Sequence, residues 1–519
     1  IKNTAIAYTP DINNILYVNK NVSGGDGSGD SWANAVPELA DALLWARTQY
    51  DADNNWLQND SLQVFVAKGT YKPLYNAADG NYTTNGNRDN AFVMVKNVQL
   101  YGGFAGSEAD LSDRDLSLAG NATVLSGDIG VLNDLSDNVY HVVVGAGNVG
   151  AALLDGFTIT SGNAIYNAST IAVNANNIRR RSGGGMYNAS SSPNLTNVSI
   201  TGNTAGSGGG MYNFSSSPNL TNVTIAGNTA TYDGGGMYNF SSSPDLTNVT
   251  ITGNTAAHSG GEMYNDNSPS LTINNSIVWG EISDTYGLGY IVNYSLIQDN
   301  TNTANGNIDA TGISEIDVFT DPANGDYTLK YTSLAVNAGN NSLYLGDLQN
   351  DLDLLGNARL YNDTAIENDV VDIGAYEYSS DLPAPVAGFS LNPANGCVTP
   401  HTVFFTDESQ QPDIWEWDFG DGSTSTVQNP THTYTAQGEY TVTLKVTDTI
   451  FNTFDTHTDV VTVQLPTVDF TTTVPNVCTP QNITFTDATV FSGGGSNSAW
   501  EWDFGDGHTS TAQNPEHTY

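Results

Sequence analysis

The stretch that decides the fold runs from residue 184 to residue 280 and holds four near-copies of one motif. The copies read GGMYNASSSPNLTNVSITGNTA (184–205), GGMYNFSSSPNLTNVTIAGNTA (209–230), GGMYNFSSSPDLTNVTITGNTA (235–256) and GGEMYNDNSPSLTINNSIVWG (260–280). Their methionines recur every 25 or 26 residues, a period typical of one turn of a solenoid. Short β-rich stretches alternate with Gly, Ser-Pro and Gly-Asn turn signals, which leaves no room for a pair of helices. The sequence therefore predicts an all-β fold, a right-handed parallel β-helix of about 25 residues per coil.

Stacking the copies in register places like residues above one another in columns. Apolar columns are expected to fill the interior, and an asparagine column to form hydrogen bonds along the axis, as in stacked cross-β chains. Ser216 is expected in a surface loop. The predicted interior columns are Met186, Met211, Met237 and Met263; Leu195, Leu220, Leu246 and Leu271; and Ile200, Ile225 and Ile251; the predicted ladder is Asn197, Asn222 and Asn248.

A tyrosine follows each methionine of the repeats, so the tyrosines form a column of their own. If this column faces outward, it is a candidate binding surface, because aromatic side chains combine a large apolar face with a polar tip. Inward packing is the favoured interpretation. The four residues are Tyr187, Tyr212, Tyr238 and Tyr264.

Residues 1–61 are predicted to form an N-terminal loop and a capping helix. The Gly- and Asp-rich stretch YVNKNVSGGDGSGDSWANAV (17–36) leads into PELADALLWARTQY (37–50), where Pro37 suits a first helical position. Apolar residues of this segment share one helical face. A solenoid needs such a cap because its terminal strands otherwise leave backbone groups unpaired.

The remaining chain divides by composition and periodicity. Residues 62–378 are assigned to the β-helix with its closing segment, and the Pro- and Ser-rich SSDLPAPVA (379–387) to a linker. Within the β-helix, an insertion around Arg179, Arg180 and Arg181 is expected to be a solvated loop, with a binding or processing site as the alternative.

Two related units follow, at 388–465 and 466–519, and the second is incomplete. WEWDFGDGSTSTVQNPTHTY (415–434) and WEWDFGDGHTSTAQNPEHTY (500–519) closely resemble the PKD domain, which implies Ig-like β-sandwiches. The tryptophans are expected in the cores, and the DFGDG aspartates are expected to accept backbone hydrogen bonds in a tight turn. Ca²⁺ binding is the alternative for Asp418, Asp421, Asp503 and Asp506, and no other cofactor is expected.

The predicted β-helix also resembles a known group of proteins. Its GGGMYN and LTNVTITGN repeats resemble bacterial surface β-helix proteins of the polymorphic outer-membrane-protein type. The closing VNAGN, LDLLGNARL and VDIGAYEY resemble the choice-of-anchor Q region of Bacteroidota surface proteins. The resemblance implies export, often by the type IX system, and supports fold and location better than molecular function.

Composition limits the partners. Lys and Arg total 14 against 55 Asp and Glu, a net charge of -41, which disfavours nucleic acid and anionic membranes. The sequence has no apolar run long enough for a membrane span. It begins with Ile and has no signal-peptide pattern, so we expect a processed, exported chain. Because the second PKD-like unit stops where the first continues with further strands, we also expect the natural chain to extend beyond Tyr519. Asp-Ser/Thr sequences followed by an aliphatic residue make Ser61, Thr364 and Thr449 candidates for O-glycosylation.

Catalytic patterns are scarce in the repeats. Polysaccharide lyases generally need a basic residue, and hydrolases need paired carboxylates, whereas residues 182–329 contain no Lys or Arg and their sparse acids share no column. Those acids, among them Glu262, are expected to be solvated. His432 and His517 occupy matching HTY positions, which indicates a structural role. The earlier coils keep an enzyme open as an alternative, because they contain Lys68, Lys72, Arg88, Lys96 and Arg114.

The sequence thus predicts an exported, non-enzymatic protein of the cell surface, serving adhesion, gliding motility or an extracellular filament. Its expected partners are cell-surface or secretion-system proteins, with surface glycans and self-assembly as alternatives. The competing hypotheses are a secreted polysaccharide lyase or hydrolase and a non-catalytic glycan-binding protein.

Overall fold

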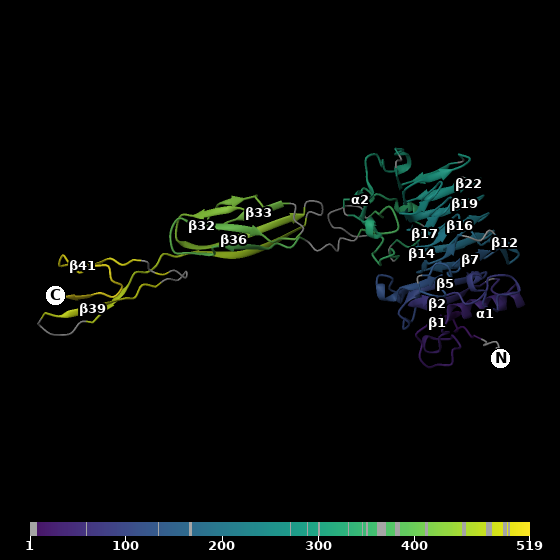
Figure 1. Cartoon of the computed structure of the whole chain (residues 1–519), viewed down its shortest axis with the longest axis horizontal. Coiled ribbons are helices and arrows are strands. Elements are labelled where there is room, and N and C mark those ends of the chain that lie inside the picture. Colours follow the sequence, from purple (N-terminus) through teal and green to yellow (C-terminus); the bar gives the residue numbers. More distant parts are fainter. Residues whose placement is uncertain are drawn as a thin grey trace. The chain divides into compact units, whose positions relative to one another are not determined.

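The computed structural model describes residues 8–58, 60–132, 134–165, 169–269, 271–287, 289–298, 301–330, 332–344, 346–348, 351–360, 370–378, 385–410, 414–448, 453–473, 480–490, 496 and 499–519. The chain divides into two compact units, Ile1–Ser379 and Ser380–Tyr519. Strands labelled along the first unit lie in successive layers of a stack, and those of the second form sandwiches (Figure 1). The predicted fold class, a β-helix followed by Ig-like sandwiches, is confirmed.

Three parallel sheets run along the stack, because successive coils add strands to them in turn. The first sheet comprises β4 (Phe92–Val93), β7 (Val143–Ala146), β13 (Met186–Ala189), β16 (Met211–Phe214), β19 (Met237–Phe240), β22 (Met263–Asp266) and β25 (Ile282–Asp284). The second has a path through β1 (Ile15–Val18), β2 (Leu62–Ala67), β5 (Val98–Phe104), β8 (Leu153–Asp155), β14 (Asn194–Thr201), β17 (Asn219–Ala226), β20 (Asp245–Thr252), β23 (Leu271–Asn274) and β26 (Tyr290–Asn293), with β3 (Gly69–Tyr71), β6 (Thr123–Ser126), β9 (Thr158–Thr160), β24 (Ile277–Trp279) and β27 (Leu296–Ile297) beside it. The third comprises β10 (Asn163–Ala164), β15 (Thr204–Ala205), β18 (Thr229–Ala230) and β21 (Thr255–Ala256).

The register is the predicted one through the first three copies. Met186 pairs with Met211 and Met211 with Met237, and the leucine and isoleucine columns stack in the same way. All of these side chains are buried in one continuous core. In the fourth copy the predicted leucine column is wrong, because Leu246 pairs with Ile273 and Leu271 pairs with Tyr290 of the next coil.

The buried polar columns exceed the predicted ladder. Asn222 donates to Asn197 at 3.2 Å, but two other buried asparagine columns form more complete ladders. In the first, each Nδ2 donates to the Oδ1 of the next coil at 2.9 Å. In the second, both the backbone N–H and the Nδ2 of Asn203 and of Asn228 donate to the Oδ1 of the next coil at 2.9 to 3.1 Å. The two ladders are Asn188, Asn213, Asn239 and Asn265, and Asn203, Asn228 and Asn254.

The asparagines of the predicted column also shape the backbone of the long strands. Asn197, Asn222 and Asn248 have φ of 53°, 56° and 52°, the left-handed conformation that Asn tolerates better than most residues. They bend the long strands. Ser216 is also not in a surface loop, because it is buried and its hydroxyl accepts from the backbone N–H of Ser191.

The predicted capping helix is present as α1 (Leu39–Ala52), which begins two residues after Pro37. It lies beside β1 at the N-terminal end of the stack (Figure 1). Leu39, Leu43 and Ala46 join the continuous core of the rod. Burial of this apolar face stabilises the first coil, whose interior would otherwise meet water.

The insertion that was expected to be a solvated loop contains a β-hairpin instead. Its strands β11 (Thr170–Val173) and β12 (Asn176–Arg179) pair antiparallel. The hairpin's Ile171, Val173 and Ile178 are buried in one cluster with Tyr187 and Tyr212. The hairpin therefore covers part of the outer face of the first sheet.

The closing segment packs on the last coils through α2 (Glu315–Val318) and the antiparallel strands β28 (Phe319–Asp321) and β29 (Asp326–Leu329). Val318, Phe319 and Leu329 share a buried cluster with the last coils. Short 3-10 helices occur in the loops of the first unit: η1 (Trp32–Asn34), η2 (Asn87–Asp89), η3 (Leu111–Asp113), η4 (Ala119–Asn121), η5 (Ala304–Gly306), η6 (Pro322–Asn324) and η7 (Asn341–Leu343).

The second unit contains the predicted β-sandwiches. The described strands of the first are β30 (Phe389–Asn392), β31 (Asn395–Gly396), β32 (His401–Asp407), β33 (Ile414–Asp418), β34 (Thr424–Ser425), β35 (Thr431–Tyr434), β36 (Gly438–Asp448) and β37 (Thr453–Val463). They form the sheets β30-β32-β35 and β31-β37-β36-β33-β34 around a core that includes Trp417.

The following repeat of the motif has β38 (Phe470–Thr472), β39 (Asn482–Asp487), β40 (Trp502–Asp503), β41 (Thr509–Ser510) and β42 (Glu516–Thr518). These strands form the sheets β38-β39-β42 and β40-β41. Throughout the residues that the structure describes, helices that combine the length and apolarity of a membrane span are absent.

Candidate functional site

The outer face of the first sheet carries a continuous aromatic column. Side chains alternate along each strand, so the methionine points into the core and the tyrosine beside it points outward. The expectation of inward packing is therefore wrong. Ring centroids of Tyr187, Tyr212, Tyr238 and Tyr264 are 5.0, 4.9 and 5.0 Å apart, close to the ~4.8 Å spacing of paired strands.

A second aromatic column lies beside the first. Phe214 and Phe240 also point outward and stack with their rings 5.3 Å apart and nearly parallel, at 5°. Both phenylalanines, like Tyr238 and Tyr264, are partly exposed. Tyr187 and Tyr212, under the hairpin, are 1% and 2% exposed. The aromatic face is therefore open on β19 and β22 and covered on β13.

The tips of the open tyrosines have polar partners. The hydroxyl of Tyr238 donates to Asp266 at 3.0 Å, and the hydroxyl of Tyr264 accepts from Thr285 at 2.8 Å. Burial and the Asp266 carboxylate raise the pKa of Tyr238 above its usual value. We define the open aromatic face as Phe214, Tyr238, Phe240 and Tyr264.

The arginines of the insertion fasten the hairpin instead of facing solvent. Arg180 forms a bidentate ion pair with Asp89, in which Nε lies 2.6 Å from Oδ1 and Nη2 lies 2.8 Å from Oδ2. The guanidinium of Arg181 lies 4.2 Å from the ring centre of Tyr232. These contacts hold the cover over the first coils.

Most basic residues of the early coils are also structural. Arg114 is buried in an ion pair with Asp155 at 3.1 Å, and Arg88 donates to the backbone oxygens of Asn138 and Asn163 at 2.7 and 2.6 Å. Lys72 lies 3.8 Å from Asp128, whereas Lys68 and Lys96 are partly exposed. The enzyme hypothesis therefore retains three lysines that reach solvent, because the Lys72 side chain is also 36% exposed.

Glu262 is buried, contrary to the expectation that it is a solvated acid. It replaces the glycine of the other copies and accepts the backbone N–H of Asn254 at 3.2 Å, which ends the second asparagine ladder where the next coil offers no asparagine. Burial raises the pKa of Glu262 to about 8 despite its contacts with Asn254. An acceptor at this position prevents an unpaired N–H at the end of the ladder.

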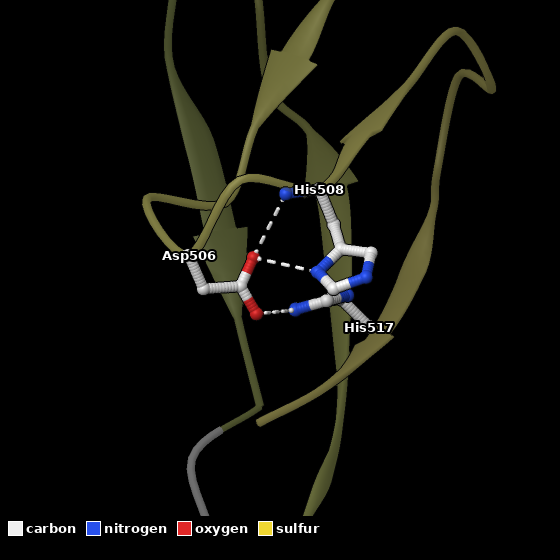
Figure 2. A group of neighbouring side chains, drawn as sticks. All are labelled: Asp506, His508 and His517. Atoms are coloured by element: carbon white, nitrogen blue, oxygen red, sulfur yellow. Dashed lines mark hydrogen bonds and ion pairs between the residues drawn. The ribbon is translucent and has the colours of Figure 1, made fainter.

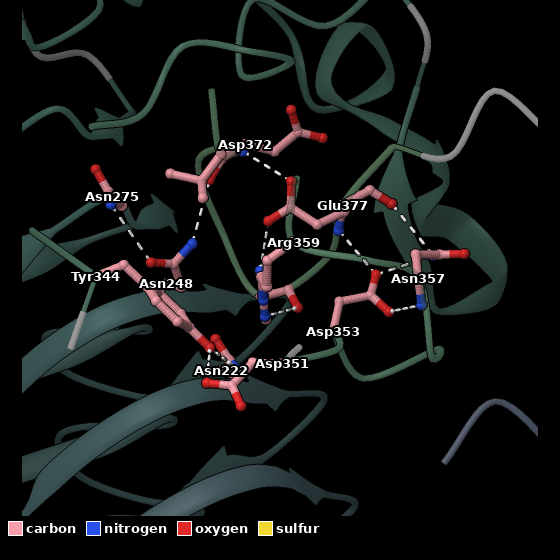
Figure 3. Close-up of polar contacts among 12 residues, drawn as sticks. Asn222, Asn248, Asn275, Tyr344, Asp351, Asp353, Asn357, Arg359, Asp372 and Glu377 are labelled. Atoms are coloured by element: carbon pink, nitrogen blue, oxygen red, sulfur yellow. Dashed lines mark hydrogen bonds and ion pairs between the residues drawn. The ribbon is translucent and has the colours of Figure 1, made fainter. Parts of the chain in front are cut away.

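The closing segment encloses a charged network (Figure 3). Arg359 and Glu377 are both buried and form an ion pair at 2.6 Å. The guanidinium also donates to the backbone oxygen of Ala375 at 3.1 Å. Glu377 accepts from the backbone N–H of Asp372 at 2.9 Å, and its own N–H donates to Asp353 at 2.8 Å. The network therefore links residues 351–360 to 370–378.

The same network is attached to the coils. Burial raises the pKa of Asp372 to about 7, and burial together with the neighbouring Asp372 raises the pKa of Glu377 well above its usual value. The closing segment contacts the asparagines at the bends of the long strands. Because their side chains are engaged in these contacts, these asparagines have little freedom to bind a ligand. The contacts are Asn222 with Tyr344 at 3.2 Å and Asn248 with the Asp372 backbone oxygen at 3.3 Å (Figure 3). Asn275 also donates to the Asn340 backbone oxygen at 3.0 Å.

The four DFGDG aspartates make the predicted turn contacts. Asp418 and Asp503 each accept the backbone N–H two residues later at 2.9 Å, and Asp421 and Asp506 do so at 3.0 Å. Calcium binding by these residues stays a prediction.

The HTY histidines pack in the predicted structural manner. His432 and His517 each stack on a phenylalanine, with ring centroids 4.3 Å apart at 2°, and each bonds to an aspartate of the turn. Within the described residues, donor atoms of three or more metal-ligating side chains lie within 4.8 Å of one another in one place, formed by Asp506, His508 and His517 (Figure 2). The sequence pattern singles out Asp506 and His517 but not His508.

The glycosylation candidates stay predictions. Ser61 is partly exposed, and its hydroxyl lies 3.4 Å from Oε1 of Gln99. Thr364 and Thr449 lie outside the described residues.

Comparison with known families identifies the two C-terminal repeats. Residues 380–463 and 464–519 match the PKD domain family. The match covers the paired DFGDG turns and HTY strands described above.

Curated relatives match over short lengths. Collagenase ColQ1 of Bacillus cereus (strain Q1) is 38% identical over 96 residues, which are 18% of this chain and 10% of the collagenase. A microbial collagenase of Vibrio alginolyticus is 45% identical over 69 residues, 12% of this chain and 8% of that protein. The chain therefore spans about a tenth of the length of these relatives.

A solved structure gives a similar match. The crystal structure of the PKD1 domain from Vibrio cholerae metalloprotease PrtV is 40% identical, and the match covers 16% of this chain and 98% of that domain with a TM-score of 0.14.

Proposed function

We propose that this chain is an extracellular, non-enzymatic binding protein of the cell surface, in which the β-helix carries the binding face and the PKD domains act as spacers. The open aromatic face carries this proposal. Its aromatic side chains are rigid, lie at regular intervals and expose large apolar surfaces, the properties of contact residues at binding surfaces. Several weak contacts along a stiff rod also add through effective concentration.

The ligand class we favour is a neutral surface polysaccharide. A pyranose ring presents an apolar face of C–H groups that can lie on an aromatic ring, and a column of rings suits a repeating chain. The net charge of -41 repels acidic polysaccharides over the whole molecule. Neutral chains avoid this repulsion.

Several weaker observations support an extracellular location at the cell surface. Two relatives are named collagenases, and collagen is an extracellular protein. The repeats and the closing segment resemble Bacteroidota surface proteins, which favours export through the type IX system and a role in adhesion, gliding or an extracellular filament. A secreted polysaccharide lyase or hydrolase is the competing function, and its strongest candidates are Lys68 and Lys96, because both reach solvent.

The test passes the full chain over immobilised neutral glycans and over pectin and alginate, and follows both retention of the protein and release of soluble sugar. We expect retention on a neutral glycan without new reducing ends or unsaturated products. Retention on acidic glycans alone would contradict the ligand class.

Substitutions of the two lysines test whether the protein is instead an enzyme. Lys68→Ala and Lys96→Ala should leave retention unchanged, because neither residue belongs to the open aromatic face. Turnover in the wild type that disappears in either variant would replace the binding function with an enzymatic one.

A further inference from the structure

One side-chain group in the second PKD repeat has only a partial counterpart in the first. Asp506 and His508 flank Gly507 in the DFGDG turn, and His517 lies on the neighbouring strand β42 (Figure 2). Asp506 Oδ1 is 3.1 Å from His508 Nδ1, and Asp506 Oδ2 is 2.7 Å from His517 Nε2. Two ring nitrogens therefore point at one carboxylate.

The first repeat shows which part of this group the fold requires. Asp421 and His432 form the same contact at 2.8 Å, and Ser423 occupies the position of His508. The Asp–His pair is therefore shared scaffold, while the second histidine is an addition. The His508 side chain is 73% exposed, so its burial contributes little to the stability of the turn.

Two imidazole nitrogens and one carboxylate oxygen are a ligand set for Zn²⁺ and not for Ca²⁺, which takes six to eight oxygens. With Zn²⁺–ligand distances of about 2.0–2.1 Å, two ligand atoms on a tetrahedral ion lie about 3.3 Å apart. The donor atoms of the three side chains already lie within 4.8 Å of one another. We propose that Asp506, His508 and His517 form a Zn²⁺ site with an open fourth position for water or an outside ligand. This site is independent of the proposed binding function.

Isothermal titration of Zn²⁺ into the chelator-treated full chain, produced without a histidine tag, tests the site. The wild type should bind one Zn²⁺ at this site, and millimolar Ca²⁺ should not displace it. His508→Ser should weaken the binding at least about tenfold, the lower end of the loss seen when an outer-shell partner of a metal ligand is removed. Because the first repeat carries Ser423 at this place, the variant should fold normally, which its circular dichroism and melting temperature check.

A gain-of-function variant completes the test. Ser423→His places the missing ligand beside Asp421 and His432, and the full chain should then bind a second Zn²⁺. Equal Zn²⁺ affinity of the wild type and His508→Ser would overturn the proposal. Failure of Ser423→His to add a site would show that these three ligand types at this spacing are not sufficient, which would also overturn it.

Discussion

The covered and open ends of one aromatic column differ in what their tyrosines can do. Tyr187 and Tyr212 repeat the geometry of Tyr238 and Tyr264, with the same ring spacing and the same position in the strand. The hairpin buries the first pair, so these rings add to the folded core, whereas the second pair keeps a surface for contacts. The same repeated residue is thus structural on one coil and a candidate for binding two coils later.

The largest expected loss of unfolding free energy comes from substituting a tyrosine under the hairpin. Tyr187→Ala should destabilise the first unit by about 3–5 kcal/mol, because it leaves a cavity between the sheet and the hairpin. Urea unfolding followed by tryptophan fluorescence measures the change. Tyr187→Phe keeps the ring but loses the hydrogen bond between the Tyr187 hydroxyl and the Arg179 backbone, so it should cost about 1 kcal/mol. A loss below 1 kcal/mol for the alanine variant would mean that the hairpin does not pack on this ring.

A smaller loss of unfolding free energy is expected when the ion pair that holds the hairpin is removed. Arg180→Ala removes the bidentate ion pair with Asp89 and should cost about 1–2 kcal/mol, since the pair is only partly exposed and well aligned. A double-mutant cycle with Asp89→Ala isolates the coupling energy. Additive effects of the two substitutions would contradict a role for this pair in holding the hairpin.

The third expected effect is a pH dependence of stability at the open end, where Glu262 directly precedes β22. Its pKa is raised from 4.5 to about 8, so its contribution to stability is complete below pH 4.5 and is lost as pH rises through about 8. Glu262→Gln keeps an oxygen for the Asn254 N–H but does not titrate. The stability of the variant relative to wild type should therefore increase as pH rises from about 5 to 8 in thermal unfolding experiments. A constant difference over this range would refute the buried, protonated Glu262.

Repetition explains what the sequence could predict. A period of 25 or 26 residues determines which residues stack, so the register, the methionine core and the existence of asparagine ladders follow from the pattern alone. The pattern fails where the period changes. Leu271 was misplaced because the fourth copy shifts its register before β23, and periodicity carries no information about such a shift.

Contacts between distant, non-repeated residues explain what the sequence could not predict. The hairpin covers Tyr187 through Ile178, and the pairing of Arg180 with Asp89 joins residues far apart in the chain. Arg359 and Glu377 likewise meet only after the closing segment has folded onto the coils. His508, in contrast, was detectable, because it is a difference between two otherwise similar WEWDFGDG segments.

Binding by paired variants tests the division of the column most directly. On the neutral glycan that retains the wild type, Tyr264→Ala should lose retention while its unfolding free energy falls by about 1 kcal/mol or less. Tyr212→Ala should keep retention at a temperature where it remains folded, while its unfolding free energy falls by about 3–5 kcal/mol. Unchanged retention of Tyr264→Ala, or lost retention of folded Tyr212→Ala, would contradict a binding face on the open end of the rod.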